Sequence, residues 1–143
     1  MKEVIALSQS EAEKYITHKP YAIISITDCN IEKEPNFIQN QFLMGVLRLK
    51  FNDIENYEPG LVRFNSAIAV KILKFVEELK EDIDILVVHC LAGVSRSAGV
   101  AAAIDDIYIQ SDKRWFVMKR PNYHVYRTIV NAYRFRNEIE GEN

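Results

Sequence analysis

A cysteine and an arginine stand six positions apart in the segment His89–Ser97, which reads HCLAGVSRS. The apolar run Ile85–Val88 leads into this segment and an alanine-rich run follows it, which predicts a turn from a strand into a helix. The first turn of a helix carries backbone N–H groups without internal partners and the positive end of the helix dipole. The segment is therefore expected to bind an anion.

The loop after Cys90 has the composition of a cradle for a tetrahedral dianion. Gly93 permits a positive φ, so successive N–H groups can converge on one point, and Arg96 offers two parallel donors to two oxygens. A thiol in such a positive field is expected to ionise and to attack phosphorus in line. Ser97 would hydrogen-bond the sulfur and help it leave, and His89 would orient the cysteine through the backbone. The expected phosphate-binding residues are Leu91, Ala92, Gly93, Val94, Ser95 and Arg96.

Alternating strand and helix patterns surround this loop and must position it. The sequence predicts an α/β fold: a central, mostly parallel sheet of about four to five strands with helices on both faces. The chain of 143 residues is expected to form a single compact catalytic domain, 1–143. Ligands of such sheets bind beyond the carboxyl ends of the strands, where the loop lies. Strands are expected at 3–7, 21–27, 45–51 (nearer an edge) and 85–88, and helices at 10–19, 61–80, 97–109, 113–119 and from 121 onward.

The motif resembles that of the cysteine-dependent protein phosphatases of the dual-specificity type: His-Cys, five residues, Arg, then Ser or Thr. HCLAGVSRS fits it without a departure, and the resemblance extends over most of the chain. It implies a protein tyrosine phosphatase-like fold and a metal-independent hydrolase of phosphoric monoesters that needs no cofactor. The implied substrate is a protein or peptide carrying phosphotyrosine, with phosphoserine and phosphothreonine as further substrates.

The resemblance also implies a general acid, an aspartate on a loop after a strand that precedes the cysteine. Asp53 occupies that place, so the expected catalytic set is Cys90, Arg96, Asp53 and Ser97. A carboxyl group there can protonate the leaving oxygen and later activate water. Glu55, Glu58 and Asp28 are weaker candidates for the same role. Pro121-Asn122 is interpreted as a helix start without a catalytic role.

Composition narrows the classes of partner and compartment. The net charge of −2 and a pI of about 5.9 argue against a general nucleic-acid binder. No apolar run approaches the ~18 residues of a membrane span, and the N-terminal segment lacks a secretory signal, so we expect a cytoplasmic protein without a membrane partner. The two cysteines form no disulfide framework, and no Cys/His cluster has zinc spacing. Cys29 could trap an oxidised Cys90, although packing is the simpler role.

Several functions stay open at this point. The substrate could be a phosphoinositide, an RNA 5′ end or a phosphoglucan, although neutral Leu91, Ala92 and Val94 disfavour a highly charged inositol polyphosphate. A rhodanese-type sulfurtransferase and a catalytically idle phosphopeptide-binding module are further alternatives. The oligomeric state is not predicted. A phosphotyrosine ring could stack on Phe37, Phe42 or Tyr57.

Overall fold

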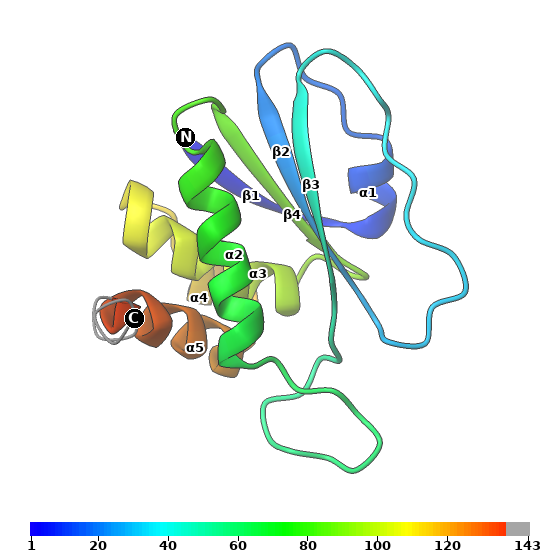
Figure 1. Cartoon of the computed structure of the whole chain (residues 1–143), viewed down its shortest axis with the longest axis vertical. Helices are drawn as coiled ribbons and strands as arrows, with labels where there is room; N and C mark the ends of the chain where they lie inside the picture. The colour runs from blue at the N-terminus through cyan, green and yellow to red at the C-terminus, as the bar shows by residue number, and fades with distance from the viewer. Residues whose placement is uncertain (137–143) are drawn as a thin grey trace.

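The computed structural model describes residues 1–136 (Figure 1). Four strands alternate with helices, and the second half of the chain is mainly helical. In chain order the elements are β1 Glu3–Ser8, α1 Gln9–Glu13, β2 Tyr21–Thr27, β3 Leu43–Lys50, α2 Ser66–Leu79, β4 Ile85–Cys90, α3 Arg96–Ile104, a π-helix at Asp105–Ile109, α4 Trp115–Met118 and α5 Tyr123–Arg134.

The strands form one parallel sheet in the order β1-β4-β2-β3. Every residue of β2 and β4, the two central strands, is buried, because both faces of these strands are covered. β3 has more exposed residues than the two central strands and lies at an edge of the sheet, as its sequence predicts. All four strands run the same way, so the segments that follow them meet at one edge of the sheet. The predicted parallel sheet of an α/β fold is confirmed, and it has four strands, the lower end of the predicted range of four to five.

Helices cover the two faces unequally. Figure 1 shows α2, α3, α4 and α5 on one side of the sheet and the short α1 on the other. The larger core lies under the first group, where alternate side chains of β2 and β4 such as Ile24 and Leu86 pack against α2, α3 and α5. The smaller core lies under α1 and the segment before β3, where Phe37 packs with Ile23 and Val87.

Small residues let α3 lie close to α5. All nine residues of α3 are buried, and a Cβ placed on Gly99 would stand 2.7 Å from the carbonyl oxygen of Asn122. That distance is shorter than real Cβ contacts, so only glycine fits here. The close approach brings the start of α5 next to the start of α3, which is the end of the predicted anion cradle.

Helix boundaries differ from the sequence-based expectation where polar side chains cap earlier or later. The first helix begins at Gln9 and ends at Glu13 instead of spanning 10–19, because β1 runs directly into α1 and a capping box forms between Ser8 and Glu11. Asn65 caps α2, which therefore begins at Ser66 instead of near residue 61. The predicted helix 97–109 leaves α geometry after Ile104 and continues as a π-helix.

Candidate active site

The turn from β4 to α3 encloses the sulfur of Cys90. Only 3% of Cys90 is exposed. Its Sγ lies 3.2 Å from the backbone nitrogen of Gly93, which donates to it, and 3.1 Å from the Oγ of Ser97. Gly93 of the predicted cradle and Ser97 at the start of α3 therefore both contact the sulfur.

Two features of this turn require glycine at position 93. Its φ is +75°, in the left-handed region. A Cβ at this position would stand 2.5 Å from the carbonyl carbon of Leu7 and 2.5 Å from the nitrogen of Ser8. The loop thus rests directly on the backbone at the end of β1, and the N–H of Gln9 donates to the carbonyl of Leu91 at 3.2 Å.

The environment of Cys90 favours its ionised form. Burial raises the pKa of the thiol, but hydrogen bonds from the Ser97 hydroxyl and from the N–H groups of Ser97 and Gly93, together with the charge of Arg96, outweigh burial. The net effect lowers the pKa of Cys90 below its ordinary value. A thiolate is the nucleophilic form of cysteine, so the lowered pKa makes Cys90 a candidate nucleophile.

Arg96 is fixed by the ends of two other strands. Its Nη1 donates to Oδ1 of Asp28 at 2.7 Å and to the carbonyl of Phe51 at 2.9 Å, and only 6% of the residue is exposed. Asp28, which follows β2, is therefore an ion-pair partner of the cradle arginine. This contact gives Asp28 a positioning role that its sequence context did not suggest, and it argues against Asp28 as the acid.

His89 is a completely buried neutral link between strands. Because a carbonyl oxygen can only accept, the ring Nδ1 donates to the oxygen of Cys90 at 3.2 Å, and Nε2 then accepts from the Ser25 hydroxyl at 2.6 Å. Burial lowers the pKa of His89, which keeps the ring neutral. The histidine therefore contacts the backbone of Cys90 and not the anion loop.

Asp53 accepts one hydrogen bond from the cradle and one from the start of α5. Its Oδ1 accepts from Ser95 Oγ at 2.8 Å and from Asn122 Nδ2 at 3.0 Å. Asn122 also caps α5, because its Oδ1 accepts from Val125 N at 3.1 Å. The helix start was predicted at this position, but the second contact of the asparagine was not. An Asn at a helix N-cap is common enough that sequence alone gave no signal for it.

The other acids of the same loop lie elsewhere. Glu55 accepts from the backbone nitrogen of Tyr123 at 2.7 Å, which ties it to the start of α5. Glu58 is exposed and makes no side-chain hydrogen bond with residues 1–136. Among the candidate acids only Asp53 contacts a cradle side chain without pairing with the arginine.

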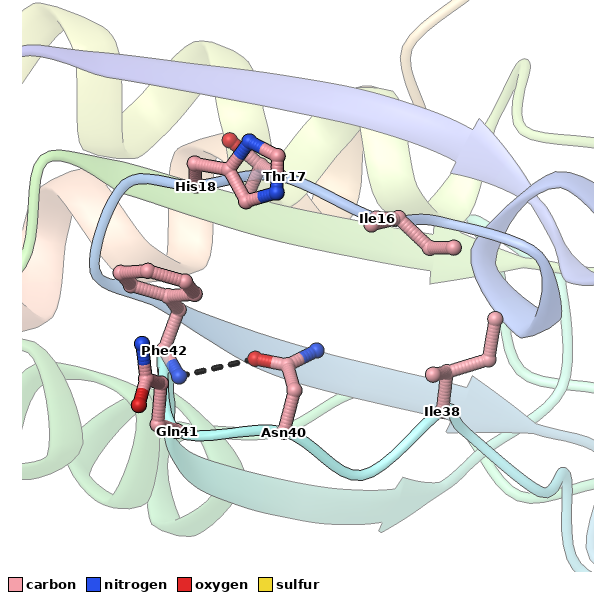
Figure 2. Close-up of a pocket in the computed structure, with 7 residues that line it drawn as sticks. All are labelled: Ile16, Thr17, His18, Ile38, Asn40, Gln41 and Phe42. Carbon is pink, nitrogen blue, oxygen red and sulfur yellow. Dashed lines mark hydrogen bonds between the residues drawn. The ribbon is translucent and has the colours of Figure 1, made fainter.

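The candidate aromatic residues and the second cysteine lie in different surroundings in the structure. Phe37 is 3% exposed and packs edge-on against His89, so it cannot stack on a ligand ring. Phe42 lies with His18 in a pocket of about 400 Å³ between the segments that precede β2 and β3 (Figure 2). Tyr57 is 73% exposed on the loop that carries Asp53 and stays available. Cys29 is an exposed free thiol.

Two sequence-level comparisons found no relative. No family model matches the chain, and no curated protein is similar to it.

Within residues 1–136, no three His, Cys, Asp or Glu side chains are grouped so that they could hold a metal ion.

Solved structures share the fold at low sequence identity. The human tyrosine phosphatase-like serine/threonine/tyrosine-interacting protein is 18% identical with a TM-score of 0.61, and the match covers 93% of this chain and 92% of the other. Human DUSP28 is 14% identical with a TM-score of 0.59, over 98% and 95% of the two chains. PTPMT1 is 17% identical with a TM-score of 0.56, over 99% and 96%. The sheet, the cradle at its carboxyl edge and these likenesses together give the chain the fold of the dual-specificity phosphatases.

Proposed function

We propose that this protein is a metal-independent phosphatase that hydrolyses phosphotyrosine, and also phosphoserine and phosphothreonine, in proteins through a phospho-cysteine. The observation that carries the proposal is the environment of one sulfur. The Sγ of Cys90 has a lowered pKa, accepts from Gly93 N and lies at the start of a loop that ends at the buried Arg96. Thiolate, amide donors and guanidinium are together what transfer of a phosphoryl dianion requires.

The first step transfers the phosphoryl group to sulfur. The thiolate of Cys90 forms the S–P bond while the bond from phosphorus to the ester oxygen breaks. Asp53 in its carboxylic acid form gives its proton to that oxygen, so an alcohol or phenol leaves. Arg96 and the loop N–H groups hold the three equatorial oxygens, whose charge is redistributed in the transition state.

The second step releases inorganic phosphate. The Asp53 carboxylate takes a proton from water, the water oxygen forms a bond to phosphorus, and the S–P bond breaks. The hydroxyl of Ser97, 3.1 Å from the sulfur, hydrogen-bonds the departing thiolate. The enzyme returns to its starting protonation state, because Asp53 has regained the proton that it gave up.

The burial of the Cys90 sulfur below the protein surface supports phosphotyrosine as the main substrate. Cys90 is nearly inaccessible, whereas Leu91 on the loop above it is 64% exposed. A phosphoryl group must therefore be carried down to the sulfur, and the long tyrosine side chain does this better than serine. The exposed ring of Tyr57 is placed on the acid loop, where it can contact a substrate ring.

A phosphoinositide is the second candidate substrate. It is favoured by likeness to a structure of PTPMT1 in complex with PI(5)P, which is 16% identical with a TM-score of 0.53 over 98% and 94% of the two chains. Against a highly charged headgroup, the cradle carries no lysine, and Arg96 is its one cation.

Hydrolysis of p-nitrophenyl phosphate in the presence of a chelator tests the proposed chemistry. Cys90→Ser should abolish turnover, whereas the matched variant Cys29→Ser should keep it. Asp53→Ala should slow hydrolysis of phenyl phosphate much more than that of p-nitrophenyl phosphate, because p-nitrophenolate needs no proton to leave. Chelator-sensitive turnover that survives Cys90→Ser would exclude the mechanism.

A panel of substrates tests the assignment to protein. Phosphotyrosine peptides should be hydrolysed with a higher kcat/KM than phosphoserine peptides or dispersed phosphoinositides. Sulfur transfer from thiosulfate to cyanide without phosphatase activity would instead indicate a sulfurtransferase. Tight binding of phosphopeptides without turnover would indicate a binding module.

A further inference from the structure

Three consecutive apolar side chains are exposed on α4, next to the active site. Trp115 is 5% exposed and its Nε1 donates to Asp105 at 2.8 Å, so this residue fixes the single turn to the core. The following residues all lie outward: Phe116 is 52% exposed, Val117 77% and Met118 56%. Single exposed apolar residues are ordinary, whereas contiguous exposed apolar groups are typical of surfaces that bind a partner.

Basic side chains border this group on both sides. Arg114 precedes it, Lys119 and Arg120 follow it, and neither arginine forms an ion pair with residues 1–136. The chain as a whole has a net charge of −2, so this local excess of positive charge is a property of the segment. We call these residues the basic–apolar patch: Arg114, Phe116, Val117, Met118, Lys119 and Arg120.

The patch and the segment that follows it are joined to the anion cradle by backbone hydrogen bonds. The nitrogen of Arg120 donates to the carbonyl of Val94 at 3.1 Å, and that of Asn122 donates to Ser95 at 2.9 Å. The ring of Phe116 packs edge-on against Tyr126 of α5, with ring centres 5.2 Å apart. A partner bound to the patch would therefore lie beside the entrance to the cradle.

We propose that the basic–apolar patch docks the protein on an anionic lipid bilayer. Its apolar side chains would enter the boundary of the acyl chains, and its basic side chains would lie among the headgroups. Charge complementarity and exposure support this occupant. Side chains as exposed as Val117 stand out from the surface, which suits insertion into a fluid layer. The hollow behind them holds about 190 Å³, which is below the size of ordinary ligand pockets, and its lining includes Asp106. An acidic peptide would find neither a groove nor a uniformly positive floor.

This docking differs from membrane spanning. Within residues 1–136, no helix has both the length and the hydropathy to cross a bilayer. The proposal revises the expectation that membranes are not partners, which was drawn from the absence of a long apolar run. It does not depend on the proposed activity, because vesicle binding can be measured with or without turnover.

Sedimentation with vesicles at physiological salt tests the proposal. The full chain should pellet with vesicles of phosphatidylcholine mixed with phosphatidylserine, and it should stay in solution with phosphatidylcholine alone. The double variant Arg114→Gln, Arg120→Gln should bind roughly 25-fold more weakly, at about fivefold for each cation near an anionic surface. Val117→Ser should bind about tenfold more weakly, because it removes an inserted apolar group.

Matched variants outside the patch serve as controls. The double variant Lys71→Gln, Lys74→Gln removes two exposed cations from α2, and Ile16→Ser removes a side chain that is 63% exposed. Both should bind vesicles like the unchanged protein. Hydrolysis of p-nitrophenyl phosphate should be unaltered in all patch variants, which verifies that they fold.

Fluorescence of Trp115, the single tryptophan, gives a second measurement. Lipids brominated near the headgroup should quench it in the unchanged protein, because the residue lies at the base of the patch. Absence of binding to anionic vesicles would overturn the proposal. Equal loss of binding in patch and control variants would also overturn it. So would selective binding of an acidic phosphopeptide that the patch variants lose while vesicles are ignored.

Discussion

The contact between Gly93 and the end of β1 makes a quantitative prediction about stability. In Gly93→Ala the new methyl group must adopt a φ of +75° and would meet the backbone of Leu7 and Ser8 at 2.5 Å. Neither backbone atom can move freely, because β1 pairs with β4 along its whole length. Replacement by alanine should therefore cost both a conformational and a steric term.

Gly60 separates the two terms. Its φ is +82°, but a Cβ there would have no heavy atom within 4 Å. A left-handed alanine costs about 1–2 kcal/mol, partly offset by the lower entropy of the unfolded chain, so Gly60→Ala should lose about 1 kcal/mol. Overpacking adds about 1–3 kcal/mol, so Gly93→Ala should lose roughly 2–4 kcal/mol of unfolding free energy.

Urea denaturation of both variants, followed by tryptophan fluorescence, measures the difference. The midpoint of Gly93→Ala should fall well below that of Gly60→Ala, with similar slopes. The thiol of Cys90 should also become less reactive in Gly93→Ala alone, because its amide donor is displaced. If the two variants lost the same free energy, the loop would not rest on β1 and the reasoning would be refuted.

Three further substitutions test single contacts of the site. Ser97→Ala should slow alkylation of Cys90 by iodoacetamide at mildly acidic pH roughly tenfold or more, because a hydrogen bond to the thiolate is lost; equal rates would contradict the role of the hydroxyl. Asn122→Ala should lower kcat through misplacement of Asp53 and reduce stability by about 1 kcal/mol through loss of the helix cap, measured by kinetics and denaturation. Asp28→Asn should lower the inhibition constant for inorganic phosphate several-fold, since the amide keeps a hydrogen bond to the cradle arginine but removes a competing negative charge; a raised constant would argue for a purely structural ion pair.

Local patterns were enough to predict the sheet and the cradle. A buried parallel strand reads as a continuous apolar run, and the sequence of β4 has this form up to His89. The loop after it was predicted because its chemistry lies within seven consecutive residues. The asymmetry of the two faces was not predicted, since a short helix and an irregular segment with Phe37 cover one of them.

Contacts between distant segments account for what the sequence did not reveal. Asp28 precedes the cradle in the sequence and Asn122 follows it. Each residue has an ordinary local explanation, Asp28 as a turn residue and Asn122 as a helix cap. Only the parallel sheet brings Asp28 to Arg96, and only the close packing of α3 on α5 brings Asn122 to Asp53. Tertiary packing similarly buries Phe37 against His89 and places Phe42 in a pocket that contains no cradle residue, so neither ring has the role that its sequence position suggested.

The placement of β1 has a consequence for the order of folding. This strand pairs within the sheet with β4 alone, so Glu3 must wait for Ile85 before it has a partner. Such separation in the chain gives the domain a high contact order and predicts slow closure of the sheet. The backbone at the end of β1, on which the cradle rests, belongs to the first residues synthesised, whereas the cradle itself belongs to later ones. A truncated or partly synthesised chain would therefore carry a cysteine of ordinary reactivity, and chemical competence would arise only with the final cooperative step.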